Sequence, residues 1–216
     1  MLILASSSPR RQQLLASSHL AFDVIPANVD ESRLVEELPQ DYVTRLAKEK
    51  AQTIARCAPP HGVVVAADTT VAINGTILGK PVDQAEAMTM LRLLRGRIHQ
   101  VYTGLAVFRP ADETCLSDWC VTHVQMRDYD EQEMLAYVAT GDPLDKAGAY
   151  AIQHEDFKPV AQIQGCYANI VGLPLCHLTH LLERLGIQPP QNMPEICRDA
   201  LQVQCVFDSQ SLSQSR

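Results

Sequence analysis

The feature that most constrains this chain stands at its amino terminus, where a short apolar run is broken by three serines. Residues 1–5 are apolar or small, as in a short buried strand. Serines at 6–8 end that run, and Pro9 follows where the first turn of a helix would begin. Leu14 and Leu15 then supply the apolar side of a short helix. The chain is therefore expected to pass from a strand into a helix through a hydroxyl-rich loop.

This strand–loop–helix unit is suited to binding phosphate. The first N–H groups of a helix have no partner inside it, and the helix dipole is positive at that end. Arg10 and Arg11 add permanent charge and forked donors that match phosphate oxygens. The pattern predicts a phosphate cradle, the alternative being that Ser8 caps the helix while the arginines are solvated. Neither G-x-x-x-x-G-K-[ST] nor G-x-G-x-x-G occurs, so a P-loop and the usual dinucleotide fold are not indicated.

Size, charge and cysteine content narrow the class of protein. A chain of 216 residues suffices for one large domain or one domain of two lobes. Its net charge of −7 argues against a general nucleic-acid or membrane surface, so local cations would have to hold an anionic ligand. Seven cysteines form no C-x-x-C pair, and no signal peptide or membrane span is recognised, so we expect reduced thiols in a cytoplasmic protein. No ligand spacing supports a zinc site.

Periodicity and turn residues predict alternating strands and helices along most of the chain. Asn74-Gly75 marks a tight turn, and a second hairpin turn is expected at 110–113. The expected strands cover residues 22–25, 62–67, 71–73, 76–78, 100–109, 114–127 and a segment ending at Gln153, and in residues 167–174 a strand is expected to lead into a helix. The expected helices cover residues 39–58, 83–94, 130–137 and a last segment that ends at Gly186.

Asp68 is the most conspicuous carboxylate of the chain. Residues 62–67 form a continuous apolar run, which is typical of a strand covered on both faces. The run ends in Asp68, Thr69 and Thr70, and strand-like sequence resumes at 71–73. A carboxylate at the end of a buried strand is desolvated unless a cation or donor meets it. We therefore favour a functional role for Asp68 over the alternative of a bond to a neighbouring loop.

Three further stretches carry candidate binding groups. Lys80 lies between a permissive glycine and a rigid proline, where the backbone can approach a ligand closely. The small residues at 147–149, between Lys146 and a strand ending at Gln153, suggest a surface that a ligand approaches, although an edge strand would look similar. The acidic pair at 30–31 is interpreted as a solvated turn unless a metal–phosphate site exists elsewhere.

Seven stretches, taken in order, resemble the motifs of the Maf family of nucleotide pyrophosphatases. They are Ser-x-Ser-Pro-Arg-Arg at 6–11, Asp-Glu at 30–31, Arg-Leu-Ala-x-x-Lys-Ala at 45–51, Ala-Asp-Thr at 67–69, Gly-Lys-Pro at 79–81, Lys-Ala-Gly-Ala-Tyr-x-Ile-Gln at 146–153 and Val-Gly-Leu-Pro at 171–174. The resemblance covers residues 1–187, which we interpret as one domain. Residues 188–216 are predicted to be a flexible C-terminal tail, alone or with one short helix.

The resemblance implies a fold and a reaction. The fold is the elongated α/β fold shared with inosine triphosphate pyrophosphatases, a curved mixed sheet flanked by helices with a cleft between two lobes. The reaction is hydrolysis of a nucleoside triphosphate between its α- and β-phosphates, which gives a monophosphate and pyrophosphate. Family members use a divalent cation, Mg²⁺ or Mn²⁺, and are commonly homodimers.

The resemblance also implies roles for residues of this chain. Asp68 would accept the proton of the attacking water, and Glu31 would share metal handling with Asp68. Several cations are needed to neutralise charge on a leaving pyrophosphate, so basic and hydroxyl side chains are expected around the triphosphate. The substrate-binding residues would be Ser6, Ser8, Arg10, Arg11, Lys50, Thr69, Lys80, Lys146 and Gln153.

Within the family, this chain resembles the branch that acts on dTTP and UTP. Arg11, Thr69 and Gln153 match that branch, and a glutamine amide can offer a donor and an acceptor to a pyrimidine edge. Gly79 and Cys166 depart from it, because glutamate and serine are more familiar there. The predicted substrates are dTTP, UTP and modified pyrimidine nucleotides.

Two alternatives stay open. One is the same chemistry on 7-methyl-GTP or another modified nucleotide. That branch has a glutamine after the catalytic aspartate and lacks the run found here at 146–153. The other is a non-catalytic nucleotide-binding regulator linked to septum formation.

Overall fold

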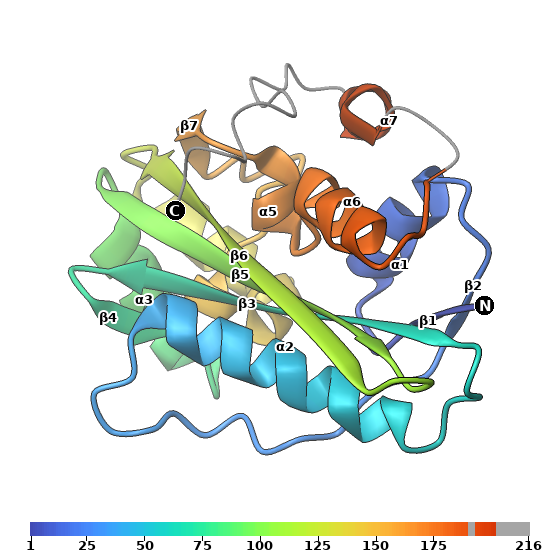
Figure 1. The fold of residues 1–216 in the computed structure, drawn as a ribbon. Helices are drawn as coiled ribbons and strands as arrows, with labels where there is room; N and C mark the ends of the chain where they lie inside the picture. The colour runs from blue at the N-terminus through green and yellow to red at the C-terminus, as the bar shows by residue number, and fades with distance from the viewer. Residues whose placement is uncertain (190–192, 202–216) are drawn as a thin grey trace.

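A computed structural model describes residues 1–189 and 193–201, which fold around a mixed sheet (Figure 1). The described strands run in the order β2-β1-β3-β5-β6-β7, with β4 also paired to β3. β2, β1 and β3 are parallel, and the other pairs are antiparallel. The strands are β1 (Leu2–Leu4), β2 (Phe22–Val24), β3 (Val63–Ile73), β4 (Thr76–Leu78), β5 (Ile98–Arg109), β6 (Thr114–Met126) and β7 (Val160–Gln164).

Helices cover both faces of this sheet, so the predicted α/β fold with a flanked mixed sheet is confirmed (Figure 1). They are α1 (Pro9–Ser17), α2 (Pro39–Ala55), α3 (Gln84–Leu94), α4 (Glu131–Ala139), α5 (Tyr167–Val171), α6 (Leu175–Arg184), α7 (Met193–Leu201) and the 3₁₀ helices η1 (Asp142–Asp145) and η2 (Ala147–Ala149). Their starts follow local chemistry: prolines stand in the first turns of α1 and α2, and the Asp83 side chain accepts the Glu86 N–H at the start of α3.

Strand β3 separates two parts of the hydrophobic core. Its even-numbered residues Val64 and Ala66 pack with Ala47 of α2, while its odd-numbered neighbours Val65 and Ala67 belong to the cluster formed with α1, α5 and α6. A third cluster joins the far end of β3 to α3 and α4. The strand is buried on both faces, as the continuous apolar run at its start predicted.

An opening in the sheet lies beside the middle of β3. On one edge β1 pairs with Val63–Val65, and β4 pairs with Val71–Ile73. Between these pairings, residues 66–70 have β5 on one side and no described strand on the other. The expectation that the strand ends at Asp68 is therefore wrong: Asp68 lies in the middle of a continuous strand, at the position where one neighbour is missing.

Two other expected strands are also wrong. The segment before Gln153 contains η2 and a turn, because Gly148 and Ala149 have left-handed backbone angles, φ 70° and 60°, which end any extended run. Residues 167–171 form helix α5 instead of a strand. A short apolar run does not distinguish a buried strand from a buried helix, and here the packing of α5 on β5 and β6 decides.

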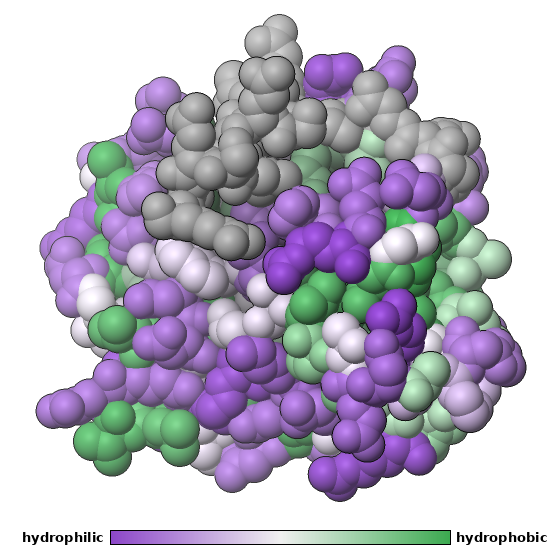
Figure 2. Space-filling model, viewed as in Figure 1, coloured by the Kyte–Doolittle hydropathy of each residue, from purple (hydrophilic) through white to green (hydrophobic). Residues whose placement is uncertain are grey.

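Part of the predicted C-terminal tail is a helix. Met193 and Cys197 of α7 are buried, and α7 packs against α1, α5 and α6. Residues 190–192 and 202–216 of the predicted tail lie outside the described residues, and the domain boundary at 187 stays a prediction. The face seen in Figure 2 is mostly hydrophilic. In the described part of the chain, no helix has both the length and the apolar composition needed to cross a bilayer.

Candidate active site

A cavity of about 1050 Å³ lies where the edge of β3 is uncovered. Its wall includes Ala5 after β1, Val71 of β3 and Val171 of α5, so it lies where the three hydrophobic clusters approach one another. Every residue that the sequence singled out for the site lines this cavity. These residues are Ser6, Ser8, Arg10, Arg11, Glu31, Lys50, Asp68, Thr69, Lys80, Lys146 and Gln153.

Two carboxylates share one ammonium group in this cavity. Lys50 Nζ donates to Asp68 Oδ1 at 2.6 Å and also lies 2.6 Å from Glu31 Oε1. Asp68 and Lys50 are both only 7% exposed, whereas Glu31 stands on an exposed loop. Helix α2 carries Lys50 on its buried face, and alternation along β3 turns Asp68 toward α2. The pair therefore follows from the packing of α2 on β3.

Burial and charge act against each other on the carboxylates. Burial raises the pKa of Asp68 above its ordinary value, against the opposing charges of Lys50 and Arg11. Partial burial also raises the pKa of Glu31, but the hydrogen bond and charge of Lys50, aided by Lys80, bring it below its ordinary value. Asp68 is thus the more basic of the two carboxylates and the better proton acceptor.

Arg11 is fixed on the opposite face of β3. Its Nε donates to the Gly172 carbonyl at 2.9 Å, and its other nitrogens donate to Thr69 Oγ1 at 3.0 Å and Ser6 Oγ at 3.3 Å. Gly172 has φ 108°, and a Cβ there would lie 3.2 Å from Arg11 Nε and 3.1 Å from Thr69 Oγ1. Only glycine fits this position without displacing the guanidinium. Burial lowers the pKa of Arg11, which nevertheless stays charged at neutral pH.

Thr69 continues this network into the sheet. Its hydroxyl lies 2.9 Å from that of Thr103 on β5, and Thr103 donates to the Asn169 carbonyl at 2.9 Å. Because Thr103 gives its hydrogen to Asn169, Thr69 must donate to Thr103 while it accepts from Arg11. The orientation of Thr69 is therefore determined by its partners, and its remaining surface lines the cavity.

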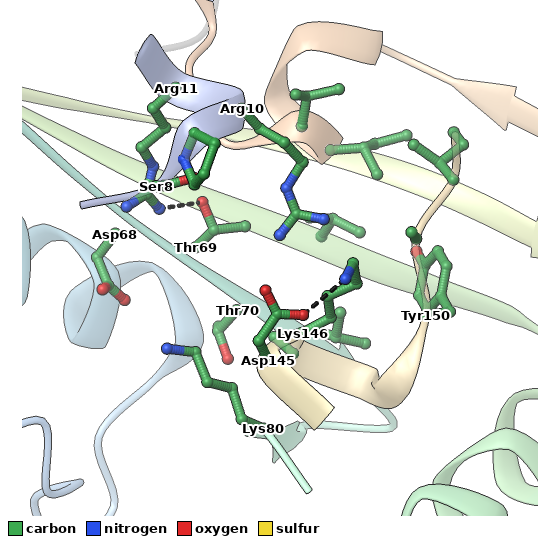
Figure 3. Close-up of a pocket in the computed structure, with 18 of the residues that line it drawn as sticks. Ser8, Arg10, Arg11, Asp68, Thr69, Thr70, Lys80, Asp145, Lys146 and Tyr150 are labelled. Carbon is green, nitrogen blue, oxygen red and sulfur yellow. Dashed lines mark hydrogen bonds and ion pairs between the residues drawn. The ribbon is translucent and has the colours of Figure 1, made fainter. Parts of the chain in front are cut away.

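The remaining cations approach the cavity from different elements. Figure 3 shows Arg10, from the start of α1, and Lys80, which follows β4, reaching toward the same space from opposite sides. Ser8 precedes α1, and its N–H donates to Ser6 Oγ at 3.2 Å, which shapes the serine loop. Distant segments thus bring further cations to the cavity that the opening motif lines.

Lys146 is at the cavity, but its ammonium is already fully bonded. Nζ lies 2.8 Å from Asp142 Oδ1, 2.6 Å from Asp145 Oδ1 and 2.6 Å from the Asp142 carbonyl (Figure 3 shows the Asp145 bond). An ammonium group has three hydrogens, so none is left for a phosphate in this arrangement. Its position supports a role in holding η1 more directly than a role in binding substrate.

Sequence reasoning missed residues that hold the Glu31 loop. The Tyr42 hydroxyl donates to the Glu31 carbonyl at 2.9 Å, and Arg45 binds both oxygens of Glu37 at 2.6 and 2.9 Å. Arg45 also donates to the Ser32 carbonyl at 3.1 Å. The helical motif at 45–51 contained Arg45, but only the loop's folded position shows what it binds.

The donor set fits a magnesium-like ion bound together with a substrate. Asp68 and Glu31 offer carboxylate oxygens, the ligands that Mg²⁺ and Mn²⁺ prefer, and both already face a shared cation in Lys50. Among the described residues, no group of three or more His, Cys, Asp or Glu side chains could hold a metal by itself. Mg²⁺ commonly takes one or two carboxylates and completes its shell with water and phosphate.

Comparison with known proteins points to one family. The family model "Maf-like protein" matches residues 1–185. The chain is 45% identical over 185 residues to a dTTP/UTP pyrophosphatase from Geotalea uraniireducens, covering 86% of this chain and 95% of that protein. It is 47% identical over 186 residues to a dTTP/UTP pyrophosphatase from Geobacter sulfurreducens, covering 86% of this chain and 96% of that protein.

Among solved structures, this chain is similar to a HAM1 protein from Coxiella burnetii. The match covers 59% of this chain and 73% of that protein's chain, with 17% sequence identity and a TM-score of 0.39. The family model covers the opening motif, the Asp68 strand and the later motifs, and each of the two bacterial pyrophosphatases covers 86% of this chain. This chain therefore belongs to the Maf-like protein family.

Proposed function

We propose that this protein hydrolyses nucleoside triphosphates, dTTP and UTP among them, to the monophosphate and pyrophosphate. The observation that carries the proposal is the pairing of buried Asp68 with Lys50 inside a cavity that Arg10, Arg11 and Lys80 also line. A triphosphate needs several cations, and hydrolysis needs one carboxylate close to the water. The relatives named dTTP/UTP pyrophosphatase support the choice of substrates.

In the proposed step, a water oxygen attacks the α-phosphorus and transfers a proton to Asp68. The bond between the α-phosphorus and the oxygen bridging to the β-phosphorus breaks, and pyrophosphate leaves with the electron pair of that bond. Arg10, Arg11 and Lys80 would stabilise the charge that develops on the leaving group. Lys50 would keep Asp68 oriented, since it holds that carboxylate at 2.6 Å.

Asp68 and Glu31 would hold a divalent cation, Mg²⁺ or Mn²⁺, in the bound state. When bound, such an ion neutralises phosphate charge and lowers the pKa of its water. Lys50 balances the charge of the two carboxylates, so they can lie close together without strong repulsion.

Gln153 is proposed to contact the base. It lies exposed on the lining of the cavity, and its amide can pair with the donor and acceptor groups of a pyrimidine edge. The homodimer and the cytoplasmic location expected from the sequence stay predictions.

The test measures pyrophosphate release with Mn²⁺ from dTTP, UTP, 7-methyl-GTP and GTP. We expect turnover of dTTP and UTP, and a loss on the order of 10²- to 10⁴-fold in Asp68→Asn. Asp118→Asn is the matched control, because Asp118 lies on β6, bonds His177 of α6 and does not line the cavity. Equal rates for wild type and Asp68→Asn would refute the role of Asp68. Nucleotide binding with no pyrophosphate release would instead favour the non-catalytic regulator.

A further inference from the structure

A single turn carries Gln153 to the cavity. The His154 N–H donates to the Ala151 carbonyl at 3.3 Å, so residues 151–154 form a turn with Ile152 and Gln153 at its two central positions. Both central residues line the cavity. The position of the Gln153 side chain therefore depends on what holds the two ends of this turn.

Tyr137 of α4 contacts both ends. Its hydroxyl oxygen accepts the N–H of Ala151 at 2.9 Å, and its ring meets the His154 ring edge to face, with 4.7 Å between centroids. The Tyr137 ring also stacks on the ring of Phe157, with 4.4 Å between the ring centroids and an interplanar angle of 16°. The Phe157 N–H also donates to His154 Nδ1 at 3.1 Å. Tyr137 is 2% exposed, so its ring has one well-defined position.

The same hydroxyl connects the turn to a second segment of the cavity wall. Since its oxygen accepts from Ala151, its single hydrogen is free to donate, and it does so to Asp142 Oδ2 at 2.8 Å. The other Asp142 oxygen accepts from Lys146. One phenol group thus joins the Gln153 turn to η1 and to the bonded ammonium of Lys146.

We infer that Tyr137 is a positioning residue for base selection: it holds Gln153 where the amide can meet the base, although it does not itself line the cavity. The inference rests on the proposed function, because it assigns Gln153 a role toward the base. It is separate from the chemistry at Asp68, which Tyr137 does not contact.

The test is Tyr137→Phe, which keeps the ring contacts and removes both hydrogen bonds. The Ala151 N–H and Asp142 Oδ2 then lose their partner, and the turn can shift. We expect the ratio of kcat/KM for UTP to that for GTP to fall about tenfold, an effect of the size expected when a partly buried polar group loses its partner. The change should appear in the KM for UTP rather than in kcat, because Asp68 and Lys50 are untouched.

Tyr129→Phe is the matched control. Tyr129 is fully buried, packs on the same Phe157 at 4.9 Å, and donates its hydroxyl hydrogen to the Leu91 carbonyl at 2.8 Å, away from the cavity. Both variants should lose thermal stability, because each removes a hydroxyl that is hydrogen-bonded, but only Tyr137→Phe should lose selectivity.

A double variant separates positioning from general damage. If Tyr137 acts through Gln153, adding Tyr137→Phe to Gln153→Ala should cause no further loss of selectivity. A wild type inactive on UTP would refute the proposed function itself. An active wild type whose selectivity is the same in Tyr137→Phe, or is changed equally by Tyr129→Phe, would refute the role of Tyr137 alone.

Discussion

Gly104 is the position at which a single methyl group should separate Asp68 from Lys50, the pair proposed to act in catalysis. It lies on β5 directly opposite Asp68 in the register with β3. A Cβ at this position would lie 2.3 Å from the Val43 carbonyl oxygen and 2.7 Å from the Thr44 nitrogen, both in the backbone of α2. Because backbone atoms cannot rotate away, Gly104→Ala must move α2 relative to the sheet.

The required movement sets the expected magnitude. Ordinary contact begins at 3.4 Å, so α2 has to move away by about 1 Å. Overpacking of this kind lowers the free energy of unfolding by about 3 kcal/mol, which for a chain of this length lowers Tm by roughly 6–12 °C. Helix α2 carries Lys50, whose ammonium binds Asp68, and a displacement of 1 Å in a catalytic group can cost on the order of 100-fold in rate.

Thermal unfolding and pyrophosphate release from UTP, measured well below the new Tm, provide the assay. Gly79→Ala is the control, since a Cβ there meets no heavy atom within 4 Å and the residue does not have a positive φ. We expect Gly79→Ala to stay within about 2 °C of wild type. A Gly104→Ala variant with unchanged Tm and unchanged kcat would refute the claim that the close approach of α2 to β5 maintains the site.

Three further predictions concern the cavity. Burial raises the pKa of Asp68 above the ordinary aspartate value of 3.8, and the carboxylate must be ionised to accept a proton. The value of kcat/KM should therefore fall as the pH drops through a pKa above 3.8. A pH–rate profile whose acid limb lies at or below 3.8 would contradict this. Glu31→Gln should raise the Mn²⁺ concentration for half-maximal activity about tenfold, and a metal titration in which wild type and variant coincide would exclude Glu31 as a ligand. Gly172→Ala should lower the free energy of unfolding by about 2 kcal/mol, because φ is 108° there and the new methyl group displaces Arg11 and Thr69. Chemical denaturation measures this, and equal stability of the two proteins would show that the guanidinium is not tightly held.

Local sequence predicted the parts of the site that are local. The opening strand, the serines and Pro9 give the strand, loop and helix that they indicated, because a proline in the first helical turn and backbone preferences act over a few residues. The long apolar run of β3 and the amphipathic α2 were likewise found from periodicity. That these segments share one cavity depended on the family resemblance, since nothing in the spacing of Lys50 and Asp68 places them 2.6 Å apart.

What could not be predicted depends on contacts between distant segments. Asp68 was expected at a strand end because polar residues interrupt an apolar run, whereas β3 continues and loses only one neighbour. The bonds of Lys146 to Asp142 and Asp145 could not be foreseen, because nothing in its own motif indicates them; its expected role toward the substrate stays a prediction. Tyr137 carried no signal at all, since a buried aromatic residue in a helix is usually core.

The shortness of β1 limits where this chain can accept insertions. β1 pairs with β3 for three residues only, and the chain then leaves the sheet as the serine loop. If added residues lengthened that pairing, main chain would extend along residues 66–68 and fill the opening where a nucleotide is proposed to bind. Extra residues at the exposed 110–113 turn would leave the opening intact. We therefore expect homologues to vary in length at that distant turn and to keep a constant spacing between Leu4 and Pro9.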